Sequence, residues 1–268
     1  MSTISANLVK ELRDQTGAGM MDCKRALEQT EGDVAAARTL LRERGMAQAG
    51  KRAGRETTEG KVGVRIRDGV GTMVAVGCET EPVSGNAEFL AYAERVLAAV
   101  ERKGPEAVES LDTERVELMA KIGENVAVRG ATRMEAGEGE ILAAYVHPPA
   151  NKIGVLVRVR GASEQAARLL AMHASFGAPG WLRRDEVPAD VLDAERSVYA
   201  NSDQVMSKPE GAREKIVEGM LAKRFFAAQP GGVLLDQPWI HDTSKTVTRA
   251  LTDEGLELVD LVRYAVNE

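Results

Sequence analysis

The residues of this chain that could do chemistry are few and lie far apart in the sequence. The chain has two cysteines, Cys23 and Cys78, and three histidines, His147, His173 and His241. No serine elbow, HExxH motif or paired-carboxylate spacing accompanies them. Two scattered cysteines are too few for a disulfide framework or a zinc site. We therefore expect no catalytic centre, no bound metal and no cofactor.

Among the histidines, His147 is the best placed to act. It follows an apolar run and precedes Pro148 and Pro149, at the expected end of a strand where a side chain faces solvent. A lone loop histidine more often makes surface hydrogen bonds than acts as a general base. An enzyme that uses His147 with nearby carboxylates is kept as an alternative.

Two glycines near the start, Gly17 and Gly19, resemble a phosphate-binding loop at first sight. Such a loop needs a strand before the glycines and a helix after them. Here a helical pattern precedes them, and no Gly-Lys-Ser/Thr follows. The pair is therefore expected to separate two helices, with glycine as the helix C-cap.

Met20 and Met21 follow this turn directly. An adjacent apolar pair at such a joint belongs either to the core or to a surface that binds another protein. Soft, unbranched methionine is common on partner surfaces. The pair therefore indicates a protein partner more than a chemical reaction.

The bulk composition excludes several classes of function. The chain has 268 residues, is 44% hydrophobic and 28% charged, and carries a formal net charge of −6. That charge argues against broad binding of nucleic acid, which needs a basic face. No apolar run reaches the roughly 18 residues that a membrane span needs. We expect a cytoplasmic chain with reduced thiols and no membrane contact.

The first 45 residues show the spacing of three short helices. Ile4, Leu8 and Leu12 fall on one face of the first. Asp22 is expected to cap the second helix and Asp33 the third, and Gly45 to stop it. Residues 46–60 then form a helical tail that runs into a linker.

After the linker, the apolar period changes from 3.6 to 2. Asp68 and Gly69 mark a tight hairpin between the first two strands. The predicted strands are 62–66, 72–76, 125–130, 141–146, 153–159 and 256–266, and the predicted helices are 87–103, 114–122, 163–175 and 246–254. Strand, turn, strand and helix thus occur twice, which predicts two related α+β layers, each an antiparallel sheet with helices on one face.

Residues 185–226 interrupt this pattern with two amphipathic stretches around a turn at 208–211. This predicts an αα-hairpin that protrudes from the core. Its outer apolar stripe fits self-association and packing on the core of the same chain about equally well.

The segment Cys78–Val83 joins a strand to a helix at the end of a sheet. Loops in this position often probe a partner. An ordinary connection stiffened by Pro82 fits the same residues.

Several of these motifs together resemble the bacterial elongation factor Ts family, whose members exchange guanine nucleotide on elongation factor Tu. The resemblance spans the chain in family order. It is found in Leu12–Leu27, Lys121–Asn125, His147, Lys152–Val157, Gln237–Ile240 and Ser244–Val247.

The resemblance implies an α+β fold with three parts: an N-terminal three-helix domain of ubiquitin-associated type, a two-part α+β core with antiparallel sheets, and a protruding helical hairpin. The expected divisions are 1–55 for the three-helix domain and linker, 56–139 for the first core subdomain, 140–184 for the start of the second, 185–226 for the hairpin and 227–268 for the completion of the core. The hairpin is also a candidate site for homodimer formation.

The resemblance also implies which residues meet elongation factor Tu. Arg13, Met20 and Met21 would dock on its nucleotide domain. The segment Thr80, Glu81, Pro82 and Val83 would enter beside its Mg²⁺ site and disturb the phosphate-binding loop, so that GDP leaves. Contacts from Ile122, Gly123 and His147 would complete the interface.

One departure from the family pattern concerns the inserted segment. Family members usually have Thr-Asp-Phe where this chain has Thr80-Glu81-Pro82, and Gly85 replaces a lysine. Proline removes the aromatic ring and a backbone N–H. Either Pro82 is a smaller wedge, or the partner has compensating changes. A scaffold that binds elongation factor Tu with weak exchange is the corresponding alternative function.

Overall fold

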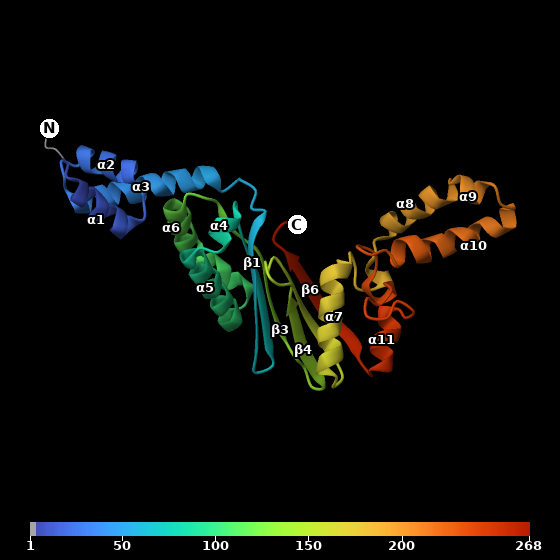
Figure 1. The fold of residues 1–268 in the computed structure, drawn as a ribbon. Helices are drawn as coiled ribbons and strands as arrows, with labels where there is room; N and C mark the ends of the chain where they lie inside the picture. Colours follow the sequence, from blue (N-terminus) through green and yellow to red (C-terminus); the bar gives the residue numbers. More distant parts are fainter. Residues whose placement is uncertain (1–3) are drawn as a thin grey trace.

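The computed structural model describes residues 4–268, apart from the side chains of residues 48 and 49. It begins with three helices, α1 (Ala6–Thr16), α2 (Met20–Gln29) and α3 (Val34–Arg52). We call α1, α2 and the first half of α3 the N-terminal module (Figure 1). Its small core contains Val9, Leu12, Cys23, Ala26, Leu27 and Ala37.

The turn between α1 and α2 is built by its two glycines. Gly17 ends α1 in the left-handed region, with φ of 69°, which glycine adopts without strain. Gly19 is the N-cap of α2, without a side-chain cap. The prediction that Asp22 caps α2 was wrong, because Asp22 lies within the first helical turn, where its charge favours the helix dipole. The predicted cap Asp33 is confirmed, since its Oδ1 accepts a hydrogen bond from the Ala36 N–H at 3.0 Å.

The sequence predicted that Gly45 ends the third helix, and this prediction was wrong. The helix continues to Arg52, and its second half packs on α6 (Asp112–Ile122). A Cβ atom placed on Gly45 would lie 2.6 Å from the Ala120 Cβ atom. The glycine therefore allows the two helices to approach each other closely, rather than ending a helix.

The first sheet has the antiparallel order β1 (Glu59–Arg67), β2 (Val70–Cys78) and β3 (Val126–Glu135). Asp68 and Gly69 form the predicted tight turn, both with positive φ. Helix α5 (Ala87–Lys103) and α6 cover one face of this sheet through a core that includes Phe89, Tyr92, Val96 and Met119. The connections are the one-turn helix α4 (Glu81–Ser84) and the 3₁₀ helix Pro105–Leu111.

The second sheet has the antiparallel order β4 (Glu140–Val146), β5 (Ile153–Arg160) and β6 (Glu257–Ala265). Helices α7 (Glu164–Gly177) and α11 (Val247–Asp253) cover its outer face. Both sheets thus carry helices on one face, as the repeated pattern predicted.

The two sheets pack against each other through their uncovered faces, which gives a helix–sheet–sheet–helix order across the core (Figure 1). The layer between them contains Val62, Met73, Ala75, Met134, Leu156 and Val266. Strand β3 is longer than predicted. It continues past Gly130, whose missing side chain leaves room for the Tyr264 ring of the facing sheet.

An arm projects from the second layer (Figure 1). The predicted two-helix hairpin is more broken than expected. It consists of a 3₁₀ turn Arg184–Glu186, α8 (Ala189–Ala200), the single turn α9 (Asp203–Met206), α10 (Glu210–Met220) and a π-helix Leu221–Phe226. Val205, Val217 and Met220 are buried within the arm. Its base is held by Val187, Leu221, Phe226 and Val233.

Candidate partner-binding surfaces

The methionine pair at the start of α2 lies on the surface. Met20 is 52% exposed and Met21 is 61% exposed, and neither belongs to the module core. Arg13, near the end of α1, is exposed as well. Two adjacent exposed methionines, with an exposed arginine on the preceding helix, are residue types suited to contact with a protein partner.

A second surface is built where the strand ends of both sheets meet. In the first sheet, Cys78 at the end of β2 pairs with Glu59 on one side and Val126 on the other. The β4–β5 loop reaches this end of the core, because the Val62 N–H donates to the Asn151 carbonyl at 2.7 Å. We call this surface, defined by Thr80–Val83, Ile122–Gly123 and His147, the strand-end surface.

The polar atoms of Thr80 are all occupied within the chain. Its N–H donates to Glu124 Oε2 at 3.0 Å, and its hydroxyl donates to Glu124 Oε1 at 2.6 Å. Its carbonyl accepts from the Cys78 thiol at 3.3 Å and from the Ser84 N–H at 3.3 Å. Thr80 therefore fixes the start of the segment.

The residues after Thr80 form the helical turn α4 rather than the predicted loop. Glu81 and Pro82 are exposed, whereas Val83 packs against the α5 and α6 layer. Pro82 stands in the first turn, where the backbone N–H has no helical partner, so its missing N–H costs nothing there. The turn presents Glu81 and Pro82 outward.

Gly123 ends α6 in the left-handed region with φ of 85°, and a Cβ atom there would meet nothing within 4 Å. The glycine is required by the backbone conformation, and it leaves open space above it. Ile122 is half-buried against the α5 and α6 layer. Both residues adjoin Thr80 through Glu124.

His147 is exposed on the β4–β5 loop, and its Nδ1 atom lies 3.0 Å from the Tyr145 hydroxyl. Among the described residues, no carboxylate bonds its ring. A general base is normally oriented by a third group. This geometry favours a contact residue over a catalytic one.

His173 is fully buried in α7. Its Nε2 atom lies 2.9 Å from Gln237 Oε1, and its Nδ1 atom accepts from the Ile240 N–H at 3.3 Å. The Nε2 atom is thus the donor of a neutral ring, which stacks on Trp239. Burial lowers the pKa of His173 to about 4. Its role is to hold the chain near the base of the arm.

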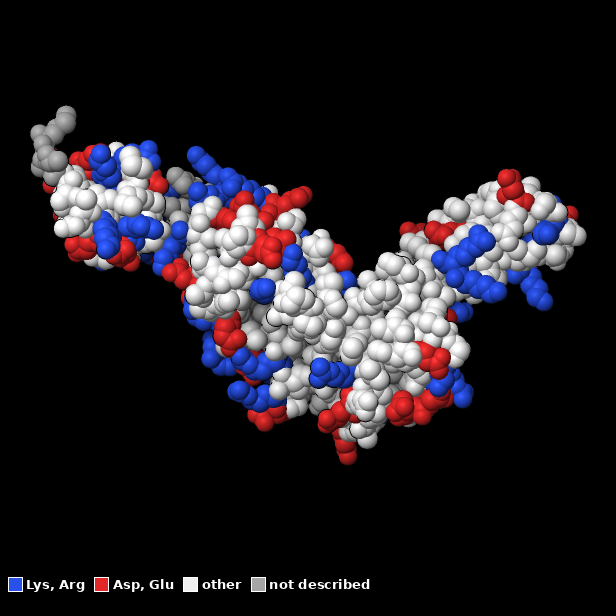
Figure 2. All heavy atoms as spheres, viewed as in Figure 1, with Lys and Arg blue, Asp and Glu red and all other residues white. Residues whose placement is uncertain are grey.

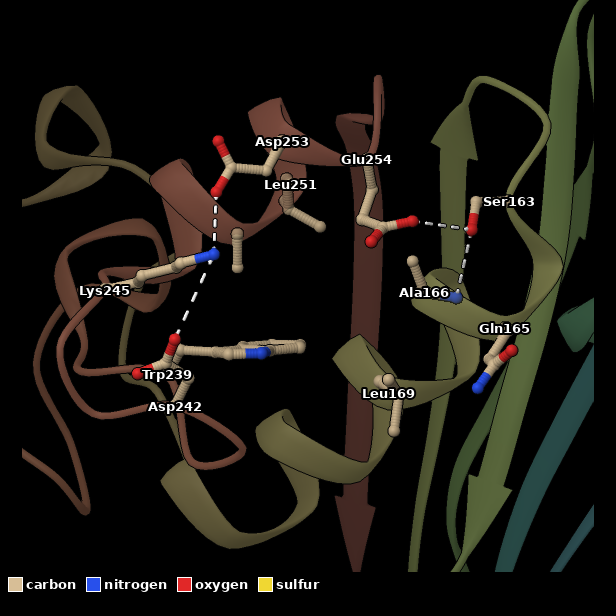
Figure 3. A pocket seen from close by; sticks show the side chains of 11 residues that line it. Ser163, Gln165, Ala166, Leu169, Trp239, Asp242, Lys245, Leu251, Asp253 and Glu254 are labelled. Carbon is tan, nitrogen blue, oxygen red and sulfur yellow. Dashed lines mark hydrogen bonds and ion pairs between the residues drawn. The ribbon is translucent and has the colours of Figure 1, made fainter.

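The hollow in Figure 3 lies between α7 and α11 and has a volume of about 250 Å³. Its charged groups bond neighbouring polar or charged side chains. Lys245 Nζ lies 2.9 Å from Asp253 Oδ2, and Ser163 donates to Glu254 Oε2 at 3.2 Å. Lys245 also lowers the pKa of Asp253. These pairs tie α7 and α11 to neighbouring segments of the chain and stabilise the fold.

The cysteines are buried, and burial raises the pKa of Cys78 to about 12. Within residues 4–268, no group of three or more histidine, cysteine, aspartate or glutamate side chains is arranged to hold a metal ion. None of the helices described there has the length and apolar character of a membrane span.

The sequence did not predict the role of Glu79, Glu124 and Asn125, whose hydrogen bonds fix the backbone of the strand-end surface. The Asn125 N–H donates to Glu79 Oε1 at 2.7 Å, and the Arg55 guanidinium lies 3.3 Å from Glu79 Oε2. Acidic groups gather where Figure 1 places α4 and the start of β1 (Figure 2). The signals in the sequence were the position of Glu124 directly after the helix-ending Gly123 and the place of Glu124 and Asn125 in the Lys121–Asn125 motif.

Comparisons with known proteins place this chain among the translation elongation factors. A family model described as Elongation factor TS matches residues 79–268. Elongation factor Ts of Idiomarina loihiensis is 38% identical over 275 residues, which cover 99% of this chain and 91% of that protein. The protein of the same name from Alkalilimnicola ehrlichii is 39% identical, with 99% and 92% covered. That of Escherichia coli O139:H28 is 38% identical, with 100% and 93% covered. The chain belongs to the elongation factor Ts family.

Proposed function

We propose that this chain is a guanine-nucleotide exchange factor that binds GDP-bound elongation factor Tu and promotes GDP release in the cytoplasm. One observation carries the proposal beyond family membership. The chain presents an exposed methionine pair on one module and an anchored segment, Thr80–Val83, on another. A factor that docks at one place and disturbs a second needs such a pair of surfaces.

The proposed mechanism needs no covalent step. The Arg13, Met20 and Met21 surface docks on the nucleotide domain of elongation factor Tu. Glu81 and Pro82 then enter beside the partner's Mg²⁺ and phosphates, and Ile122, Gly123 and His147 contact the partner around them. A carboxylate brought to that site changes the charge balance that holds the ion and the GDP. If this chain binds nucleotide-free elongation factor Tu more tightly than the GDP-bound form, it must weaken GDP binding by the same ratio of affinities.

The test is release of fluorescent GDP from loaded elongation factor Tu in the presence of excess unlabelled GDP. We expect release to accelerate with the concentration of this chain and to saturate. The matched control is the chain with Met20→Ala and Met21→Ala, which should need a higher concentration. No acceleration at any concentration would refute the proposal.

A scaffold that binds elongation factor Tu with weak exchange is favoured by one observation, the exposed proline at position 82. Binding measured by calorimetry with no effect on GDP release would identify it. An enzyme that uses His147 would instead bind a small substrate or nucleotide without elongation factor Tu. Nucleotide binding by the free chain would therefore distinguish such an enzyme from an exchange factor.

We also propose that residues 185–226 form a homodimer contact. Val198 is 64% exposed and Met206 is 52% exposed on the arm, where other apolar side chains are buried. Light scattering should give twice the chain mass at micromolar concentration, and Val198→Ser with Met206→Ser should give the single mass. A monomer for the unchanged chain would contradict this proposal.

A further inference from the structure

Two carboxylates behind the strand-end surface each bind the backbone of the other's segment. Glu124, after α6, accepts from the Glu79 N–H at 3.2 Å and from the Thr80 N–H at 3.0 Å. Glu79, after β2, accepts in return from the Asn125 N–H at 2.7 Å. We call these four residues, Glu79, Thr80, Glu124 and Asn125, the clasp.

The clasp also holds the linker that follows the N-terminal module. Asn125 is 2% exposed, and its Nδ2 donates to the Arg55 carbonyl at 2.6 Å and to the Ala53 carbonyl at 3.4 Å. Two acceptors on one amide nitrogen fix which way the side-chain amide points. Three segments, distant in sequence, are therefore tied at one place.

Hydrogen bonds to a carboxylate are shorter and stronger than those between neutral groups. Glu124 takes three, including the Thr80 hydroxyl at 2.6 Å. Without it, the backbone N–H groups of Glu79 and Thr80 would lose this acceptor, and the turn α4 would lose the anchor at its N-cap, Thr80. Glu124 is also set behind the segment, with Glu81 and Pro82 on the outward side.

We propose that Glu124 is a positioning residue for exchange: it fixes the backbone at Thr80 so that Glu81 and Pro82 meet the partner in one orientation. This inference rests on the proposed function. Geometry held to a fraction of an ångström by supporting residues is what an effective site requires. Glu124 thus acts through Thr80.

The first test uses the free chain, so it does not depend on the proposed function. Amide hydrogen exchange should show about tenfold less protection at Glu79 and Thr80 in Glu124→Ala. Protection in the middle of β2 should not change. Glu138→Ala is the matched control, since Glu138 is an exposed glutamate on the β3–β4 turn. Unchanged protection at Thr80 would overturn the clasp.

The second test measures GDP release from elongation factor Tu against the concentration of each variant. We expect Glu124→Ala to lower the maximal rate about tenfold and to leave the half-saturating concentration within about twofold. A raised half-saturating concentration with an unchanged maximal rate would overturn a positioning role and identify a docking contact.

A conservative variant guards against loss of the fold. Glu124→Gln keeps the shape and one carbonyl oxygen for the two backbone N–H groups, and should recover most of the maximal rate. If Glu124→Ala does not fold, Thr80→Val replaces it, because it removes only the hydroxyl that binds Glu124. A maximal rate unaffected by Thr80→Val would then count against the proposal. If the unchanged chain fails to accelerate GDP release, the proposed function fails, while the hydrogen-exchange result still decides the clasp.

Discussion

At the scale of single residues, exposure separates the methionines that support the fold from those that are free to bind. Met73 and Met119 are buried between layers, whereas Met20 and Met21 lie outside the module core. The sequence could not decide this, because an apolar pair after a turn fits either role. The packing of α1 on α2 decides between the two roles, because it buries Leu12 and Cys23 and leaves Met20 and Met21 exposed.

The first prediction concerns this pair. Met20→Ala with Met21→Ala should weaken binding to elongation factor Tu about tenfold or more, since large apolar anchors dominate interfaces. The free energy of unfolding should change by less than about 0.5 kcal/mol, as for other exposed sites. Calorimetric titration and urea unfolding measure the two quantities.

Leu12→Ala is the contrasting variant, because Leu12 is fully buried. It should cost about 2–5 kcal/mol of stability. If the double methionine variant unfolds as easily as Leu12→Ala, the methionines are core residues and the docking assignment is wrong.

The second prediction concerns Pro82. Pro82→Phe restores an aromatic ring on the exposed first turn of α4, where the new N–H needs no helical partner. We expect the maximal rate of GDP release to rise severalfold and the melting temperature to stay the same. Pro82→Ala, which removes the ring without adding an aromatic one, is the control. An unchanged rate in Pro82→Phe would show that a wedge is dispensable in this chain.

At the scale of elements, α3 joins the N-terminal module to the core. Its first half supplies Ala37 to the module, and its second half packs on α6 at Gly45. A sequence pattern shows which residues of a helix are apolar, but not which second helix crosses it. Gly45 was therefore interpreted as a stop, although Ala120 on α6 explains it.

The third prediction compares two glycines of this helix. Gly45→Ala should destabilise the chain by about 1–3 kcal/mol, because the new methyl group meets Ala120. Gly50→Ala should stabilise it by up to about 1 kcal/mol, since nothing lies near that position and alanine favours a helix. Thermal unfolding measures both. Equal effects would mean that α3 and α6 do not touch at Gly45.

The same limit explains which parts of the fold and site were predictable. Alternation of apolar residues predicted the positions of the strands in both sheets. The Asp68–Gly69 turn predicted the register in which β1 pairs with β2. The length of β3 was missed because Gly130 belongs to a contact between sheets. Glu124 was missed because its partners, Glu79 and Thr80, lie more than 40 residues away.

At the scale of the whole molecule, a buried polar network joins the core to the base of the arm. Gln237 accepts from His173 and donates to the Gly177 carbonyl at 2.9 Å and the Ala228 carbonyl at 3.0 Å. This network includes the end of α7 and the chain that returns from the arm. The His173 Nδ1 atom accepts the Ile240 N–H at 3.3 Å only while the ring is neutral, and the buried site disfavours the charged ring, so the stability of the molecule is linked to pH.

The fourth prediction follows from the sign of that linkage. The pKa of His173 falls from 6.5 to about 4 on folding, so the unfolded chain binds the proton more readily. The stabilisation is present above pH 6.5 and is lost as the pH falls toward 4. Between pH 7.5 and pH 5, the free energy of unfolding should drop by about 2 kcal/mol from this group.

Urea unfolding at several pH values measures this drop. His173→Gln should be less stable at pH 7.5 but should lose the pH dependence due to this group. His241→Gln, a change at an exposed neighbour, should retain it. A pH profile of His173→Gln parallel to that of the unchanged chain would contradict the assignment.

The burial of both cysteines has a practical consequence for following the molecule at work. Neither Cys23 nor Cys78 is exposed, and the raised pKa of Cys78 keeps its thiol protonated at neutral pH. One new cysteine at Lys208 on the arm and another at Glu31 in the module, both exposed positions, would therefore react with dyes while the native thiols stay unlabelled. Energy transfer between those dyes would then report changes in the distance between the arm and the N-terminal module as the partner binds and dissociates.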